Sequence, residues 1–418
     1  MKDSGIDWIG KIPDEWEINK IDSLYTLRNT KVSDKNYPPL SVTMKGIVPQ
    51  LATAAKSDDG DNRKLVKKGD FVINSRSDRR GSSGISNYDG SVSLINTILT
   101  PRGKMNPDYY NWLFHTVQFE DEFYKWGHGI VDDLWTTRWQ DMKNISVLVP
   151  PEEAQEKIAG FLDKKCSEID SVIEESKKSI EEYKAWKQSV IFEAVTGKNF
   201  SCKKKNSGIE WLGEIPETWE VKRFKCIIDS LEKGNGITKD EVFSDGDTSC
   251  VRYGEIYSKY DTSFENCFSK TFKDKIPVKK YFSNGDLLFV GTGELVEEIG
   301  KCIAYLGNEQ CLAGGDIIIA KHKQNAKFLS YAMNSHYAQA QKSCGKAKLK
   351  VVHISATEIG NVLLALPPLS EQESIAKFLD KKCAQIDSLI IEKQSLIKDL
   401  AEYKKSLIFE AVTGKRRV

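Results

Sequence analysis

The strongest constraint on this chain is that parts of its sequence are written twice. Residues 4–17 read SGIDWIGKIPDEWE and residues 207–220 read SGIEWLGEIPETWE, with nine of these 14 positions identical. Residues 151–198 align without a gap to residues 368–415, and 27 of those 48 positions match. A period of about 210 residues is far too long for a solenoid, so the chain contains two copies of one domain-sized unit.

The segments between the shared blocks, about 18–149 and 221–366, barely resemble each other. Their apolar runs are short and often β-branched, and Gly, Asn and Asp separate them, as expected for strands and turns. These runs are 71–73, 92–99, 287–290 and 317–320. Helical patterns follow near the end of each segment, at 107–125 and 325–342. Each varied insert is therefore predicted to be an α+β domain.

The shared segments read as long helices with a heptad seam. In the first copy the seam positions step alternately by four and three residues. They are 162, 166, 169, 173, 176, 180, 183, 187, 190 and 194, and the second copy repeats them from 379 to 411. Lys187 and Lys404 interrupt the seam at the same place. A helix of about 42 residues would be about 63 Å long, more than a compact domain needs.

Two such helices in one duplicated chain most simply pack against each other. A pseudo-two-fold axis would make them antiparallel, with one varied domain at each end. The alternative is that each helix packs separately on its own domain. The predicted boundaries are a first domain at 1–150, a central helix at 151–198, a second domain at 199–367 and a C-terminal helix at 368–418.

Several aromatic side chains on these helices lie off the seam, and some of them could dock a partner protein because aromatic residues are enriched at interfaces. The candidates are Phe161, Trp186, Phe192, Phe378, Tyr403 and Phe409. Cys166 and Cys383 lie on the seam, where a small apolar core role is favoured over a redox role.

Basic residues cluster in the inserts although the whole chain has a formal net charge of only +1. Residues 62–80 hold seven basic side chains against two acidic ones, and residues 336–353 hold four lysines and no acidic residue. Arginine forks and small hydroxyls suit guanine edges and phosphates. The candidate DNA-contacting residues are Arg63, Lys67, Lys68, Arg76, Arg79, Arg80, Ser82, His128, Lys342, Lys346, Lys348 and Lys350. The plainer alternative is that these clusters are ordinary solvated surface.

Motifs for catalysis are missing. The sequence has no Walker-type loop, no complete dinucleotide fingerprint, no Asn/Asp-Pro-Pro-Tyr/Phe motif and no convincing nuclease cluster. Its nine cysteines form no Cys-x-x-Cys pair and no zinc-type cluster with histidine, so no metal site is expected. This pattern favours a binding module that is not itself an enzyme and carries no cofactor.

The duplicated openings, the PP-x-x-x-Q-x-x-IA-x-FLD helices at 150–163 and 367–380, and the IFEAVTGK endings carry a family resemblance. The chain resembles the specificity subunit of type I restriction–modification systems over essentially its whole length. The resemblance implies two target-recognition domains, each reading one half of a split DNA site, with the helices fixing the spacer. It also implies docking of two modification subunits and of restriction subunits. S-adenosylmethionine, ATP and Mg²⁺ would belong to those partners.

Two different inserts on one frame predict an asymmetric DNA target, since identical inserts would predict a palindrome. The alternative function is a non-catalytic scaffold whose two varied domains bind proteins. No apolar run reaches the roughly 18 residues needed for a membrane span, and the first residues do not read as a signal peptide. A cytoplasmic protein is therefore expected.

Overall fold

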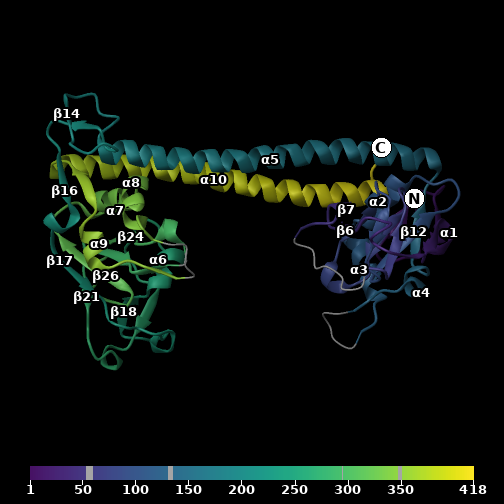
Figure 1. Cartoon of the computed structure of the whole chain (residues 1–418), viewed down its shortest axis with the longest axis horizontal. Coiled ribbons are helices and arrows are strands. Elements are labelled where there is room, and N and C mark those ends of the chain that lie inside the picture. Colours follow the sequence, from purple (N-terminus) through teal and green to yellow (C-terminus); the bar gives the residue numbers. More distant parts are fainter. Residues whose placement is uncertain (53–59, 130–134, 294, 347–350) are drawn as a thin grey trace. The chain divides into compact units, whose positions relative to one another are not determined.

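The computed structural model describes residues 1–52, 60–129, 135–293, 295–346 and 351–418. The chain divides into two compact units, of which unit 1 comprises residues 1–177 and 394–418 and unit 2 comprises residues 178–393. Two long helices, α5 (Glu152–Thr196) and α10 (Leu369–Val412), each contribute one half to each unit. Each unit is therefore one mixed domain with two half-helices packed on it (Figure 1).

Unit 1 is built on an antiparallel sheet in the order β10-β9-β12-β4. Its strands are β4 (Tyr25–Arg28), β9 (Phe71–Asn74), β10 (Ser83–Ile85) and β12 (Asn96–Pro101). A second sheet, β11-β8-β5, and the pairs β6-β7, β13-β3 and β1 (Lys2–Asp3) with β2 (Lys11–Ile12) complete the β structure of the described residues. These strands are β3 (Glu17–Lys20), β5 (Lys31–Val32), β6 (Leu40–Thr43), β7 (Gly46–Pro49), β8 (Arg63–Val66), β11 (Gly90–Val92) and β13 (Ser146–Val149). The helices are α1 (Ile21–Leu24), α2 (Pro107–Phe114), α3 (Val117–Lys125) and α4 (Trp139–Met142).

Unit 2 repeats this plan with additions. Its main sheet has the order β17-β26-β22-β24-β19, and a second sheet has the order β20-β18-β25-β21. The strands are β17 (Ile228–Lys233), β18 (Thr248–Val251), β19 (Ser263–Phe264), β20 (Ser269–Thr271), β21 (Tyr281–Phe282), β22 (Leu287–Val290), β24 (Cys302–Tyr305), β25 (Cys311–Ala313) and β26 (Ile317–His322). The pairs are β14 (Lys204–Asn206) with β15 (Glu214–Pro216), β16 (Glu220–Arg223) with β28 (Leu363–Leu366) and β23 (Thr292–Gly293) with β27 (Val352–His353). The helices are α6 (Tyr253–Ser258), α7 (Ala326–Asn334), α8 (His336–Ser343) and α9 (Ala356–Gly360).

The two inserts therefore share a topology that their sequences conceal. The antiparallel pairs β9–β10, β9–β12 and β12–β4 in unit 1 correspond to β22–β24, β22–β26 and β26–β17 in unit 2. In both units a helix pair precedes a short helix and a final strand, and unit 2 has the additional strand β27 before its short helix. The predicted α+β class is confirmed, and so is the pseudo-two-fold repeat.

The predicted heptad seam is confirmed on both helices, because every seam position is buried or half-buried. Within unit 1, Asp170 of α5 pairs with Lys404 of α10, and Leu162 shares the core with Ala411. Early residues of α5 thus lie beside late residues of α10, so the two helices run antiparallel. Cys166 and Cys383 are both buried in this packing.

The ends of the long helices pack on the duplicated opening motifs. Gly197 has a φ of 72°, and a Cβ at this position would collide with the ring of Pro216. Gly414 has a φ of 68°, and a Cβ there would collide with Pro13 in the same way. Only glycine combines this left-handed backbone with so close an approach, which explains the Thr-Gly ending of both copies.

The glutamine of the shared PP-x-x-x-Q motif joins each long helix to its domain. The Gln155 side chain accepts a hydrogen bond from the backbone N–H of Asn106 (2.8 Å) and donates one to the carbonyl of Pro150 (2.8 Å). Gln372 accepts from the N–H of Asn325 (3.0 Å) and donates to the carbonyl of Pro367 (2.9 Å). Both glutamines are fully buried, so each one satisfies two main-chain groups that have left water.

The structure differs from the sequence prediction in the helical parts of the inserts. The segment 107–125 is not one helix but two, because the Thr116 hydroxyl accepts from the N–H of Phe119 and starts a new helix. The segment 325–342 is likewise divided, at Ser335. Neither long helix, nor any other helix within the described ranges, is long and apolar enough to cross a membrane.

Candidate nucleic-acid interface

Two loops meet at the same place in each unit. In unit 1, loop 75–82 follows β9, the described residues of segment 126–138 (126–129 and 135–138) follow α3, and the N–H of Ser77 donates to the carbonyl of Trp135 (2.9 Å). In unit 2, the described residues of segment 291–301 (291–293 and 295–301) follow β22, and those of segment 344–355 (344–346 and 351–355) follow α8. Strand pairing of Thr292 with His353 joins these two loops. We call each set the paired loops. They occupy equivalent positions in the two domains and differ in sequence.

The first segment of the paired loops, 75–82 in unit 1 and 291–301 in unit 2, has opposite net charge in the two units. Loop 75–82 has three arginines and one aspartate, whereas loop 291–301 has three glutamates and one lysine. That lysine, Lys301, donates to the carbonyls of Ile256 (2.8 Å) and Tyr260 (2.7 Å), so its ammonium group is held within the domain. Burial lowers the pKa of Lys301. The two units therefore differ in the charged residue types of these equivalent sequence segments.

The three arginines of loop 75–82 differ in how they are held. Arg76 donates to both carboxylate oxygens of Asp78 (2.8 and 3.0 Å). Arg80 donates to Glu120 (3.0 Å) and Asp121, which tie it to α3. Arg79 lies 3.8 Å from Asp78 and 67% of its side chain is exposed. Arg79 is therefore the arginine of this loop most available to a ligand.

The other predicted residues of the unit 1 paired loops have separate roles. His128 is exposed, with its Nε2 lying 3.4 Å from Oδ1 of Asp141. Ser82 is buried, and its backbone closes the loop by bonding to Asn74 and Arg79. His128 thus faces solvent at the site, whereas Ser82 shapes it through its main chain.

The basic run 62–80 does not form one patch, because β9 carries the chain from one end of the sheet to the other. Arg63 is only 5% exposed and donates to Oγ (2.8 Å) and to the carbonyl (3.1 Å) of Ser91. Burial lowers the pKa of Arg63. The expectation of an exposed cation at Arg63 is wrong, since its guanidinium group is buried and hydrogen-bonds to strand β11.

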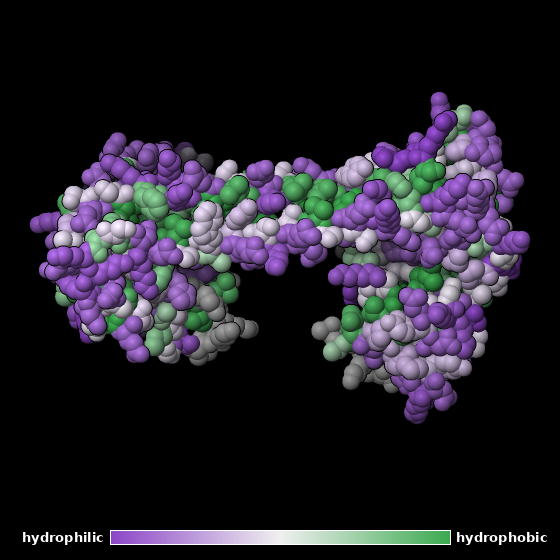
Figure 2. Space-filling model, turned by 90° about the horizontal axis from the view of Figure 1, so that it is seen from above, coloured by the Kyte–Doolittle hydropathy of each residue, from purple (hydrophilic) through white to green (hydrophobic). Residues whose placement is uncertain are grey.

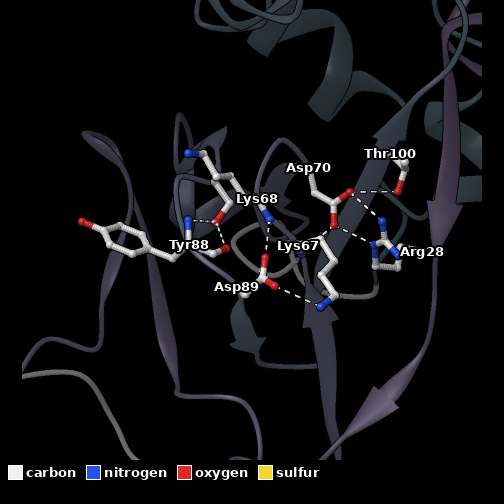
Figure 3. A network of polar contacts seen from close by, with 8 residues as sticks. Arg28, Lys67, Lys68, Asp70, Tyr88, Asp89 and Thr100 are labelled. Carbon is white, nitrogen blue, oxygen red and sulfur yellow. Dashed lines mark hydrogen bonds and ion pairs between the residues drawn. The ribbon is translucent and has the colours of Figure 1, made fainter.

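Lys67 and Lys68 lie in the turn before β9, at the opposite end of that strand from Arg79. Figure 3 shows the network around this turn, in which Asp89 accepts from Nζ of Lys67 (3.0 Å) and from the N–H of Lys68 (2.8 Å). The neighbouring Asp70 accepts from the guanidinium of Arg28 (2.7 and 3.0 Å). These bonds stabilise the turn, and the side chain of Lys68 is exposed.

The predicted lysines of unit 2 are also largely engaged within the domain. Lys342 is 2% exposed and donates to the carbonyl of Gly300 (2.7 Å), and burial lowers its pKa to about 8. The expectation that it is an exposed cation is therefore wrong. Lys346 donates to the carbonyl of His353 (2.6 Å) and to Glu358 (2.7 Å), and this ion pair lowers the pKa of Glu358 to about 2. Lys348 and Lys350 lie outside the described residues.

A second basic surface in unit 2 was not among the predicted residues. It consists of Lys270, Lys273, Lys275, Lys279 and Lys280. Lys275 lies 3.9 Å from the ring centroid of Phe243, a cation–π distance, and Lys280 pairs with Glu232 (2.8 Å). A count of charges over 270–280, five lysines against one aspartate, would have found it.

The predicted docking residues divide into two groups by exposure. Trp186, Phe378 and Tyr403 are exposed by 47%, 40% and 48%. Phe161, Phe192 and Phe409 are half-buried against the domain cores or the helices. Figure 2 shows hydrophobic residues at the surface of the long helices. The exposed apolar residues of these helices include Val172, Leu389, Ile391 and Leu396. An apolar helix surface of this kind is typical of a protein interface.

Comparison with known proteins identifies the class that this fold and these loops define. Residues 13–182 and 216–399 match the model of the type I restriction modification DNA specificity domain, once for each copy. The matches cover most of the chain. The chain therefore belongs to the family of type I restriction–modification specificity subunits, as its sequence motifs suggested.

Individual relatives agree with this assignment. The chain is 25% identical to the type I restriction enzyme MjaVIII specificity subunit of Methanocaldococcus jannaschii, covering 98% of this chain and 94% of that protein. Among solved structures, a chain from a study of complex assembly and conformational transition of the type I restriction–modification system matches with a TM-score of 0.74. Its identity is 15%, and the match covers 97% of this chain and 100% of that one. The HsdS subunit from Thermoanaerobacter tengcongensis matches over the full length of both chains, with a TM-score of 0.56 and 15% identity.

Proposed function

We propose that this chain reads a bipartite, asymmetric DNA site, with each unit recognising one half. The observation that carries this proposal is the recurrence of the paired loops at one position in two topologically equivalent domains, with opposite charge in their first members. A common scaffold with different side chains at one place is what two different half-site readers require. Base contacts specify sequence, so differing loops imply differing half-sites.

The near-zero net charge indicates that phosphate binding is shared with other subunits. Affinity for duplex DNA rises with the number of phosphates that a protein neutralises. Several of the basic side chains in this chain are held by carboxylates or carbonyls of their own domain, as at Arg80 and Lys346. We therefore expect the isolated chain to bind DNA weakly and the assembled complex to bind it well.

The antiparallel helices would fix the spacer between the half-sites and dock the partner subunits. Ion pairs between α5 and α10 support a fixed register, and exposed aromatic side chains on the same helices offer docking points. The proposed partners are two modification subunits, which would bind S-adenosylmethionine, and restriction subunits, which would use ATP and Mg²⁺. This chain would contribute recognition and no catalytic step.

Domain exchange tests the proposal. Residues 18–149 would be replaced by the corresponding insert of another specificity subunit, and methylated sites would be mapped in cells that also express the methyltransferase partner. We expect one half of the methylated sequence to change and the other half to persist. Replacing residues 221–366 is the matched control and should change only the other half. A change in both halves, or in neither, would contradict the modular proposal and favour the protein-binding scaffold.

A further inference from the structure

We propose that a cavity beside Arg79 in unit 1 is a base-reading site, with Arg79 as the residue that recognises guanine. The inference rests on the proposed function and adds a residue, a base and a half-site to it. The cavity has a volume of about 740 Å³ and lies between the β6–β7 hairpin and the loop after β9. Its walls include Arg79, Gln50, Asn74, Asn96 and Thr43.

The chemistry of these walls suits the edge of a base pair in the major groove. Three arginines (Arg63, Arg79 and Arg80), three side-chain amides and several hydroxyls line the cavity, and Asp78 is its one acidic wall residue among those described. Arginine pairs with O6 and N7 of guanine through two parallel hydrogen bonds. Asparagine and glutamine pair with adenine in a similar way. A binding site for a phosphate alone would not need the amides.

Arg79 is assigned because its neighbours are already occupied. Arg76 uses two nitrogens on Asp78, and Arg80 bonds Glu120 and Asp121. Asp78 therefore has both oxygens engaged by Arg76, and this leaves Arg79 at 3.8 Å. Because Arg76 already neutralises the Asp78 carboxylate, the exposed guanidinium of Arg79 loses little electrostatic attraction when it turns towards a base.

The side chain of Asn96 independently supports a ligand in this cavity. The residue is 4% exposed, and its Nδ2 donates to the carbonyl of Ser93 (3.1 Å), which fixes the orientation of the amide. Its Oδ1 has no hydrogen-bond partner within the described ranges. A buried acceptor without a donor is costly. The amino group of a cytosine or adenine, directly or through one bridging water, would satisfy it.

Unit 2 has no equivalent of Arg79, since the sequence of segment 291–301 contains no arginine and its single lysine is held by two carbonyls. The inference therefore assigns the guanine to the half-site read by unit 1. Exchange of residues 18–149 identifies that half independently of Arg79.

The test uses the full chain assembled with its methyltransferase partner, with methylated sites mapped in cells for Arg79→Lys and Arg79→Ala. Arg79→Lys keeps the charge and loses the fork. We expect one guanine position in the unit 1 half-site to become degenerate, with discrimination falling by roughly 5- to 150-fold. The unit 2 half-site should be unchanged. Lys104→Ala, an exposed lysine in the turn before α2, is the matched control and should leave both half-sites intact.

Two results would overturn the inference. If Arg79→Lys and Arg79→Ala methylate an unchanged sequence, Arg79 contacts at most a phosphate. If both half-sites lose specificity together, the effect is on folding or assembly, which thermal unfolding of the purified variants checks. Failure of the proposed function looks different, because the wild-type complex would then show no bipartite methylated sequence.

Discussion

Nζ of Lys187 on α5 lies 2.8 Å from both carboxylate oxygens of Asp387 on α10. The repeat contains the reciprocal pair, since Nζ of Lys404 lies 2.7 Å from both oxygens of Asp170. Each lysine belongs to one copy and its aspartate to the other, so the two pairs are related by the pseudo-two-fold symmetry. A single polar residue at a seam position can fix the register and orientation of a coiled coil. We infer this role for both lysines.

Removing the aspartate should destabilise unit 2 more than removing both partners. Burial lowers the pKa of Lys187, but the hydrogen bond to Asp387 and the charges of Asp261 and Asp387 together raise it overall. Asp387→Asn would leave a half-buried ammonium group short of its counter-ion, whereas Lys187→Met would fit the apolar seam. A double-mutant cycle by chemical unfolding should give a coupling of about 0.5–1 kcal/mol. Lys184→Met, which removes an exposed pair with Glu181, is the control. A coupling energy for Lys187–Asp387 no larger than that of the exposed Lys184–Glu181 pair would contradict a role of Lys187 in fixing the register.

Substitution of the buried glutamines should lower the folding stability more than substitution of any other polar residue in the repeated segments. Gln155→Ala leaves the N–H of Asn106 and the carbonyl of Pro150 without partners away from water. We expect a loss of about 2 kcal/mol or more in the free energy of unfolding, measured by urea denaturation. Gln188→Ala, at an exposed position of the same helix, should change little. Equal effects of the two substitutions would show that the hydrogen bonds of Gln155 add nothing to the stability of unit 1.

Much of the packing of the two long helices could be predicted from sequence, because heptad spacing indicates which residues are buried. Leu162, Cys166 and Ile169 were placed on the seam by their spacing alone, and all three are buried. The break between α2 and α3 was missed because both helices pack on one core, so the apolar period continues across Thr116. Only the hydroxyl bond to Phe119 marks the boundary, and a lone threonine is a weak signal.

The candidate site could be predicted as a region but not residue by residue. Charge counting selects 62–80 as a basic region, yet it cannot reveal that β9 separates Lys67 from Arg79. Arg63 and Lys342 are buried by contacts with Ser91 and Gly300, 28 and 42 residues away along the chain. Local composition contains no information about such distant partners.

A difference between the copies predicts a stabilising substitution in unit 1. Lys327 of α7 pairs with Asp380 (2.7 Å), but the equivalent residue of α2 is Asp108, which faces Asp163. Burial, and then the Asp163 charge, raise the pKa of Asp108. The carboxyl pKa of Asp108 is higher in the folded chain than in the unfolded chain. The folded state therefore loses stability as the pH rises from the unfolded pKa through the folded pKa. At neutral pH the ionised form of Asp108 thus destabilises the folded state.

Asp108→Lys should therefore raise the stability of unit 1 at pH 7, by about 0.5 kcal/mol because the site is only partly shielded and solvent screens the charges. The gain should shrink at high salt and vanish near pH 3, where the carboxyl group of the wild type is protonated. Thermal unfolding across pH and salt measures both effects. Lys327→Asp is the matched reversal in unit 2 and should destabilise it. A gain that is independent of pH and salt would point to helix propensity and not to charge.

The last prediction concerns the length of the helices. The residue numbers of the pairs 187–387 and 170–404 both sum to 574, and the repeat offset is 217, so residues 178 and 395 lie at the middle of this pattern in the sequence. Deleting 176–182 together with 393–399 removes one heptad from each helix around these positions and keeps the heptad seam in phase. Seven residues span about 10.5 Å of helix, which corresponds to about three base pairs of duplex at 3.4 Å each. If the helices set the spacer, mapping of methylated sites should show a gap about three base pairs shorter, or no methylation where the helical twist of DNA prevents simultaneous contact. Deleting only 176–182 is the control and should disrupt folding by shifting the seams. Efficient methylation at the original spacing by the double deletion would show that the helices do not measure the gap.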